Sequence, residues 1–158
     1  MSGKAEIEIR PEDAQQPDVT VLFATSDAYH AALYPAESNH LVGVDEFICG
    51  GAIFLVARSM PEGTAVGCGG VVARPGGYGE IKRMWIKPGL RGLGLGRRML
   101  EALEAAARAR GLWVLRLETG IRQPEAVGLY WAAGYMDCGP FGDYAADPLS
   151  LFLEKKLD

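Results

Sequence analysis

Apolar and polar residues alternate along several short stretches of the chain, and this period of two predicts β-strands. The pattern first occurs at residues 5–10, where Pro11 stops it. Two apolar runs, 53–57 and 64–73, flank a turn sequence at 60–63 and therefore predict a hairpin. Three further strands are predicted over residues 80–86, 113–118 and 150–156.

Other stretches repeat their apolar residues at intervals of three and four, which predicts amphipathic helices. Residues 19–34 predict a helix that Pro35 ends, and residues 94–110 predict a second one, followed by Gly111. Two more helices are predicted over 125–133 and, as a short one, within 41–48. Three antiparallel strands are thus followed by strand, helix, strand, helix and strand, which predicts a mixed α/β sheet.

Length and composition narrow the class of protein. The chain has 158 residues, of which 49% are apolar and 23% charged, so we expect a single domain over residues 1–158. No apolar run approaches ~18 residues, and the first six residues already include the charged residues Lys4 and Glu6. We therefore expect a cytoplasmic protein with neither a membrane span nor a signal peptide.

The cysteines and histidines do not form a recognisable metal or disulfide pattern. Cys49, Cys68 and Cys138 are odd in number and lack C-x-x-C spacing, and His30 and His40 are the only histidines. We therefore expect no metal site and no disulfide framework, which agrees with a reducing compartment.

Charge is distributed unevenly along the chain. Residues 1–80 hold four Lys and Arg against eleven Asp and Glu, whereas residues 81–158 hold twelve against nine. Within the second half, residues 81–100 carry six basic residues and no acidic one. One basic cluster in an acidic protein favours a small polyanion as ligand over nucleic acid, which would need a broader basic face; a solvated basic edge is the alternative.

A glycine-rich turn lies inside this basic cluster, where a predicted strand runs into a predicted helix at residues 85–98. Glycines allow a ligand close to the backbone, and the first helical N–H groups there favour an anion such as a pyrophosphate. A P-loop is excluded because Arg97 and Arg98 stand where Lys and a hydroxyl residue are required. A dinucleotide fingerprint fails as well, because Arg97 or Met99 stands at its last glycine.

Arg91, Gly94 and Gly96 match the pattern Gln/Arg-x-x-Gly-x-Gly/Ala. Here the sequence resembles the GNAT superfamily of N-acetyltransferases, and the likeness extends from the first strand to Leu157, including the helix and turn at 123–135. The resemblance implies a mixed, mostly antiparallel sheet of six or seven strands flanked by about four helices.

The resemblance also implies an acyl coenzyme A as co-substrate, with acetyl-CoA expected. Main-chain groups of Met84, Trp85 and Ile86 would pair with the pantetheine arm. The pyrophosphate would lie on N–H groups of the turn, contributed by Arg91, Gly92, Leu93, Gly94, Leu95, Gly96 and Arg97. Lys87, Arg97 or Arg98 could reach the remaining phosphate. Gln123 stands where the family often has Asn, and it can still reach the co-substrate.

Transfer to an amine requires that the ammonium lose a proton and that the leaving thiolate gain one. The resemblance places Tyr130 beside the thioester sulfur, and a phenol with a pKa of ~10 suits the role of acid. Glu80, at the start of a strand, faces the family's acceptor channel, and we expect it to act as base, directly or through water.

The resemblance also indicates where the acceptor binds. Six polar residues are candidates for contact with it: Tyr34, Glu37, His40, Glu118, Thr119 and Asp143. Because residues 1–80 are acidic and resemble the acceptor side, we expect a small cationic or zwitterionic amine, attracted by Glu37 or Asp143.

Three functions remain in competition. The first is a small-molecule N-acetyltransferase, the second a protein or peptide N-acetyltransferase of the same fold, and the third an inactive acyl-CoA-binding sensor. The presence of Glu80 and Tyr130 argues against the sensor. Long loops at 35–51 and 138–148 favour a closed pocket over the open groove that a protein acceptor needs. No nucleic acid or membrane partner is expected, and a homodimer is left open.

Overall fold

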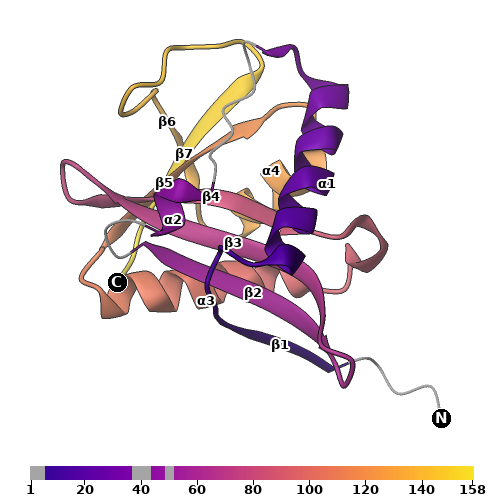
Figure 1. Ribbon diagram of the computed structural model, residues 1–158. Helices are drawn as coiled ribbons and strands as arrows, with labels where there is room; N and C mark the ends of the chain where they lie inside the picture. Colours follow the sequence, from indigo (N-terminus) through magenta and orange to yellow (C-terminus); the bar gives the residue numbers. More distant parts are fainter. Residues whose placement is uncertain (1–5, 37–43, 49–51) are drawn as a thin grey trace.

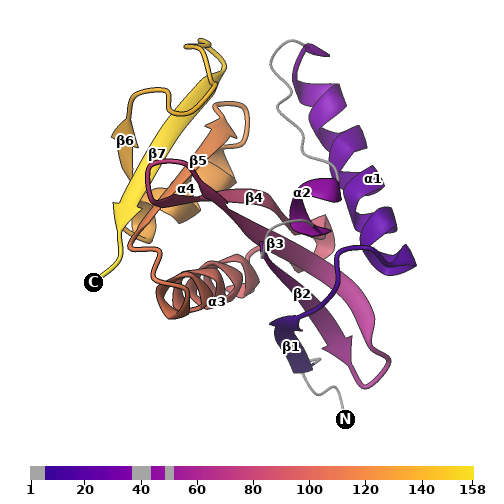
Figure 2. The same ribbon diagram turned by 60° about the vertical axis from the view of Figure 1, so that its left-hand side comes forward.

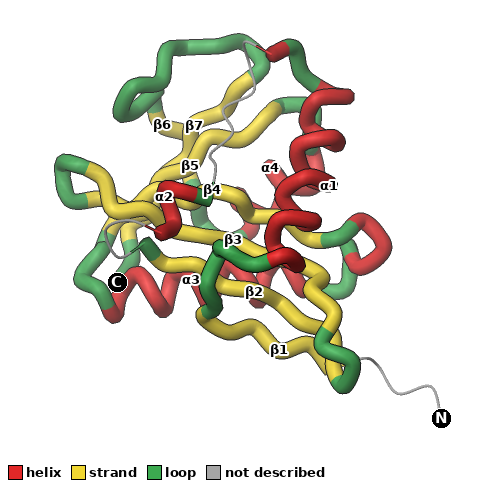
Figure 3. Tube along the Cα trace, viewed as in Figure 1, coloured by secondary structure: helices red, strands yellow, loops and turns green. Residues whose placement is uncertain are grey.

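The computed structural model describes residues 6–36, 44–48 and 52–158 (Figure 1). Its elements, in chain order, are β1 (Glu6–Pro11), α1 (Pro17–Leu33), α2 (Asp45–Ile48), β2 (Ile53–Met60), β3 (Thr64–Arg74), β4 (Tyr78–Ile86), a 3-10 turn (Pro88–Leu90), α3 (Leu95–Ala109), β5 (Val114–Gly120), α4 (Pro124–Ala132), β6 (Met136–Cys138) and β7 (Ser150–Lys156). Figure 3 shows the same trace by element type. None of the helices in these ranges is long and apolar enough to cross a bilayer.

The seven strands form one sheet in the order β1-β2-β3-β4-β5-β7-β6. Every neighbouring pair is antiparallel except β4 and β5, which are parallel. The mixed, mostly antiparallel sheet that the sequence predicted is therefore confirmed, and the described part of the chain holds four α-helices around it.

The helices cover both faces of the sheet. Figure 2 shows α1 and α2 on one side and α3 and α4 on the other. Each face has its own apolar core: Met99, Leu100 and Leu103 of α3 belong to one, and Phe23 and Phe47 to the other. Trp85 of β4 packs in the α1 core. Strand β4 therefore lies at the centre of the sheet with both faces covered.

Three details of the strands differ from the sequence prediction. Strand β6 was not predicted, because three residues are too few to show a period, and it forms only by pairing along β7. Pro11 was expected to stop β1 but is its last residue, opposite Leu55. An edge strand tolerates proline because one side of its backbone needs no N–H partner. The second strand was predicted to end at residue 57 but extends to Met60. The predicted short helix within 41–48 is seen as α2, and residues 41–43 lie outside the described residues. The bounds of the other predicted elements agree with the structure within about two residues.

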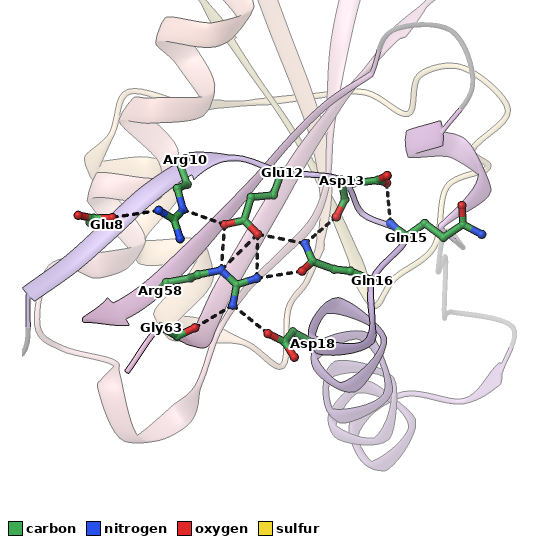
Figure 4. Close-up of polar contacts among 9 residues, drawn as sticks. All are labelled: Glu8, Arg10, Glu12, Asp13, Gln15, Gln16, Asp18, Arg58 and Gly63. Carbon is green, nitrogen blue, oxygen red and sulfur yellow. Dashed lines mark hydrogen bonds and ion pairs between the residues drawn. The ribbon is translucent and has the colours of Figure 1, made fainter. Parts of the chain in front are cut away.

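A buried arginine fixes the start of α1 against the sheet (Figure 4). Arg58 of β2 donates to Glu12 Oε1 at 2.8 Å, to Asp18 Oδ2 at 2.8 Å and to the Gly63 carbonyl at 2.8 Å. Its hydrogen bonds lower the pKa of Glu12 to about 2. The Glu12 carboxylate thus stays charged at neutral pH. The guanidinium ties together β2, the loop before α1, and α1 itself.

Candidate active site

Strands β4 and β5 pair only where they begin. The parallel register consists of Gly79 with Leu115 and Glu80 with Arg116, and the two strands separate beyond that point. Figure 2 shows β5 leading away from β4 beside α4. The later main-chain groups of β4 on that edge therefore have no strand partner, which is the condition for an extended ligand to pair with them.

A cavity of about 410 Å³ lies beside the free part of β4. Three segments contribute most of its lining: the end of β4, the glycine-rich turn, and the start of α4. The lining residues are Tyr29, Met84, Trp85, Ile86, Arg91, Gly92, Gly94, Gly96, Arg97, Gln123, Pro124, Glu125, Ala126, Leu129 and Tyr130. The structure thus brings most of the residues predicted for the co-substrate around one space.

The glycine-rich turn presents the beginning of α3 to the cavity. Gly94, the residue before the helix, has φ of 79°, and Gly92 has φ of 86°. Both values lie in the left-handed region, which side chains with a Cβ disfavour. The turn therefore needs glycine for its shape, and it leaves the first N–H groups of a 15-residue helix without helical partners. This arrangement suits a phosphate group.

The basic side chains around the turn have different directions. Arg91 donates from Nε to the Ile86 carbonyl at 3.1 Å, and its guanidinium lies 4.6 Å from the centre of the Trp85 ring, forming part of the cavity wall. Arg97 also lines the cavity. Arg98 instead donates to the Ile7 carbonyl of β1 at 2.9 Å, outside the lining of the cavity.

Two residues predicted at the turn do not line the cavity. The Leu93 side chain is exposed, and Leu95 is buried in the core on the α3 side of the sheet. Their main-chain N–H groups stay in the turn as predicted pyrophosphate donors.

Tyr130 lies on α4, buried, with its ring edge-on to Tyr135 at 5.8 Å. It belongs to the core and also lines the cavity. Burial, and to a smaller extent the charge of Glu118, raises the pKa of the Tyr130 phenol above its ordinary value. The hydroxyl is therefore protonated at neutral pH and available as a hydrogen-bond donor.

Glu80 is buried in a cluster of charged and polar groups at the start of β4. Arg74 donates to Oε1 at 2.9 Å, and the Tyr144 hydroxyl donates to Oε2 at 2.6 Å. Lys82 Nζ lies 3.4 Å from Oε2 and donates to the Tyr144 hydroxyl at 2.6 Å. Glu80 does not line the cavity. Two cations, Arg74 and Lys82, thus lie within ion-pair distance of its carboxylate.

A chain of hydrogen bonds joins α1 to the start of α4. His30 Nδ1 lies 2.8 Å from the Ser26 carbonyl, so this nitrogen carries the proton and Nε2 accepts from Gln123 Nε2 at 3.1 Å. The Tyr34 hydroxyl donates to Gln123 Oε1 at 3.2 Å and accepts from the Arg122 N–H at 3.0 Å. Burial lowers the pKa of His30, which keeps this imidazole neutral. Both ends of the Gln123 amide are thus fixed, one by His30 of α1 and the other by Tyr34, the residue after α1.

The structure places the predicted acceptor residues in different surroundings. Tyr34 and Thr119 are buried, and Asp143 is exposed. Glu118 is half-buried. Burial raises the pKa values of Tyr34, Tyr130 and Tyr144, and the charge of Glu118 adds a smaller effect of the same sign on all three phenols. Glu37 and His40 lie outside the described residues.

Several residues around the site were not found from the sequence. Tyr29 carries no motif, and only the packing shows that it lines the cavity. Tyr144 lies in the loop at 138–148 that was expected to close a pocket, and only the structure shows its hydrogen bond to Glu80. His30 could have been found, because residues 26, 30 and 34 repeat at one helical turn and place Ser26, His30 and Tyr34 on one face of α1.

This fold is shared with acyl-CoA N-acyltransferases. The model of the Acetyltransferase (GNAT) family matches residues 12–135. The chain belongs to this family, as the sequence resemblance predicted, and it is an acyl-CoA-dependent N-acyltransferase that uses acetyl-CoA.

Individual relatives agree with this. A protein of Azospirillum brasilense named IAA acetyltransferase is 48% identical over 152 residues, which cover 96% of this chain and 98% of that protein. A crystal structure from Klebsiella pneumoniae, of a protein assigned to the acyl-CoA N-acyltransferases, has a TM-score of 0.82 and 39% identity, covering 98% of this chain and 100% of that one. A GNAT family acetyltransferase from Elizabethkingia anophelis, solved with acetyl-CoA bound, shares the fold, with a TM-score of 0.69 and 17% identity; 98% of this chain and 100% of that one are covered.

Proposed function

We propose that the protein transfers the acetyl group of acetyl-CoA to the primary amine of a small molecule. The observation that carries this proposal is the cavity, in which the free edge of β4, the N-terminus of α3 and the phenol of Tyr130 meet. A relative 48% identical over nearly the whole chain is named for acetylation of IAA, which supports a small-molecule acceptor.

The residues present fit acetyl-CoA along the whole cavity. The N–H groups at Gly92–Arg97 would hold the pyrophosphate, with Arg97 beside it. Main-chain groups of Met84, Trp85 and Ile86 would pair with the pantetheine arm, and Gln123 would contact it from α4. Acetyl-CoA supplies a thioester whose carbonyl carbon accepts the amine. The protein would orient that carbon, remove a proton from the ammonium group of the acceptor and give a proton to the leaving thiolate.

Tyr130 would donate a hydrogen bond to the sulfur and protonate the departing thiolate as the C–S bond breaks. Its raised pKa keeps the proton in place until negative charge develops on the sulfur. Glu80 does not line the cavity, so we propose that it receives the ammonium proton through water or through Tyr144. In the second case the Tyr144 oxygen takes a proton from the amine while its own proton passes to Glu80.

The charges beside the cavity support a cationic or zwitterionic acceptor. Glu118 acts on Tyr34, Tyr130 and Tyr144, three phenols that can donate or accept hydrogen bonds around an amine. The acidic balance of residues 1–80 acts in the same direction, with Asp143 exposed on the loop before β7. An anionic acceptor would meet repulsion from these carboxylates.

The test is a thiol-release assay with acetyl-CoA and a panel of amines, amino acids, polyamines, aminoglycosides and peptides. We expect turnover with a small cationic or zwitterionic amine. Turnover with peptides alone would favour the protein acetyltransferase, and coenzyme A binding without turnover on any acceptor would favour the sensor. Acetylation of only anionic or hydroxyl acceptors would contradict the proposed acceptor class.

The proposed base has its own test in Glu80→Gln. We expect the rate of the wild type to rise with pH as the base is freed, and the variant to lose or shift this rise while it still binds coenzyme A. Glu46→Gln is a matched control, because Glu46 also pairs with Arg74, at 3.1 Å, but has no contact with Tyr144 among the bonds described. If both variants give the wild-type pH profile, Glu80 is not the base.

A further inference from the structure

Strand β4 has an irregularity within the wall of the cavity. Its pairing with β3 includes Gly70 opposite Lys82 and then Cys68 opposite Trp85, so two residues of β4 stand opposite Gly69 alone. An extra residue of this kind is a β-bulge, which bends the strand and redirects the groups that follow it. Those groups belong to Met84–Ile86, which line the cavity.

The first of the two bulge residues, Arg83, has an unusual backbone. Arg83 has φ of 57°, and it is the one residue other than glycine with positive φ in the described ranges 6–36, 44–48 and 52–158. A residue with a Cβ disfavours this left-handed region, so the surroundings must stabilise the conformation. The strain lies directly before Met84, at the proposed place of the acyl group.

Three contacts hold Arg83 in this conformation. Its guanidinium donates to Asp27 Oδ1 of α1 and lies 4.3 Å from the centre of the Phe23 ring, also on α1. Its carbonyl accepts the Sγ–H of Cys68 at 3.2 Å, so the bulge leaves this oxygen with a partner. The Arg83 side chain is only 7% exposed. The conformation of β4 is thus fixed by helix α1, on the face opposite α4.

We propose that Asp27 and Arg83 are positioning residues for acetyl transfer. The ion pair holds the bulge so that the main chain of Met84 and Trp85 is directed at the acyl end of the co-substrate. This inference rests on the proposed function, because it takes these main-chain groups as the acyl-CoA site. Neither residue lines the cavity, so both would act through the backbone of β4.

A second ion pair on the same helix allows a controlled comparison. Asp18 pairs with buried Arg58 at 2.8 Å (Figure 4), as Asp27 pairs with Arg83. The Asp18 pair ties α1 to β2 and has no contact with the bulge. A variant of Asp18 therefore shows how the loss of an α1 ion pair affects the stability of the fold. A variant of Asp27 shows the same effect together with any effect on the conformation of β4.

The experiment compares Asp27→Asn with Asp18→Asn in the full chain. For Asp27→Asn we expect kcat to fall about 10- to 100-fold, because a displacement near 1 Å in a reacting group has an effect of that order. The Kd for coenzyme A, measured by calorimetry, should change little, since the glycine-rich turn is untouched. Without ligand, amide hydrogen exchange at residues 83–86 should accelerate. Asp18→Asn should lower the melting temperature without these changes.

Substitutions of Arg83 test the backbone directly. Arg83→Gly removes the side chain but adopts positive φ freely, whereas Arg83→Ala removes it and keeps the penalty. We expect the glycine variant to retain the higher kcat, the reverse of the ordinary preference of a strand for alanine over glycine. This comparison stands even if Asp27→Asn fails to fold.

Two results would overturn the inference. One is a kcat for Asp27→Asn equal to that of Asp18→Asn, with equal hydrogen exchange at residues 83–86. The other is an Arg83→Ala variant as active as Arg83→Gly. A wild type that binds no coenzyme A in calorimetry would contradict the proposed function instead, so the two failures are distinct.

Discussion

At the scale of single residues, two neighbouring tyrosines show why burial alone does not define a role. Tyr130 and Tyr135 are both buried, with their rings edge-on at 5.8 Å. The Tyr135 hydroxyl donates to Glu104 at 2.9 Å, within the α3 side of the core. Tyr130 lines the cavity. The same residue type therefore supports the core in one case and is available for chemistry in the other.

This difference predicts the effect of removing each hydroxyl. Tyr130→Phe should lower kcat by ~100- to 10,000-fold, the ordinary contribution of a general acid, because the ring keeps its packing and only the donor is lost. The Kd for coenzyme A should stay near that of the wild type. Steady-state kinetics and calorimetry measure the two effects.

Tyr135→Phe is the control for this prediction. It removes a hydroxyl whose partner is the buried carboxylate of Glu104, so it should lower the melting temperature while the folded fraction keeps its kcat. Equal kcat in Tyr130→Phe and the wild type, with chemistry limiting turnover, would leave Tyr130 with a packing role only.

At the scale of elements, helix α3 has a left-handed glycine next to each end. Gly94 precedes it with φ of 79°, and Gly111 follows it with φ of 76°. Around both positions, space is open for an added Cβ. The two glycines therefore have similar backbone conformations and similar free space around them. They differ because Gly94 lines the cavity and Gly111 does not.

We therefore predict that Gly94→Val and Gly111→Val lose similar amounts of stability, about 1–3 kcal/mol each, from a β-branched residue at positive φ. Only Gly94→Val should lose coenzyme A affinity, because its side chain and its altered turn obstruct the pyrophosphate. Denaturant unfolding and calorimetry give the two quantities. Comparable coenzyme A affinity in both variants would contradict the proposed phosphate site.

At the scale of the whole molecule, the divergence of β4 and β5 lets helices from opposite faces of the sheet touch. His30 and Tyr34 of the α1 side bind the two ends of the Gln123 amide, at the start of α4. Three charged residues lie near the His30 ring and act on it: Asp27, Arg83 and Arg91. The two faces are thus joined by polar contacts beside the cavity.

This junction predicts a dependence of stability on pH. Burial lowers the pKa of His30 below its ordinary value of 6.5, so between these two values the unfolded chain binds more protons. The contribution of His30 is therefore fully present above pH 6.5 and is lost as the pH falls below it. Urea unfolding at a series of pH values should show this loss in the wild type.

In His30→Gln the loss should be smaller, because a glutamine offers a donor and an acceptor without titrating. At pH 8, where the histidine is neutral, the free energies of the two proteins should differ by an amount that does not change with further rise in pH. A His30→Gln protein with the same decline between pH 6.5 and 5 would show that other groups cause it.

Local sequence determined the parts of this protein that depend on near neighbours along the chain. The strand, glycine turn and helix at residues 78–109 follow from hydrophobic period and from glycines where positive φ is needed. The most specific functional prediction, a pyrophosphate turn of the GNAT type, came from this segment because helix starts and turns are set by adjacent residues.

Only the tertiary structure decided which distant residues meet. The bulge at Arg83, the hydrogen bond from Tyr144 to Glu80, and the contact between His30 and Gln123 each join separate segments of the chain. None has a local signal, because strand register and the divergence of β4 from β5 arise from pairing and packing of the whole sheet. For the same reason the sequence suggested Glu80 as a base, whereas its neighbours in space determine how accessible its carboxylate is.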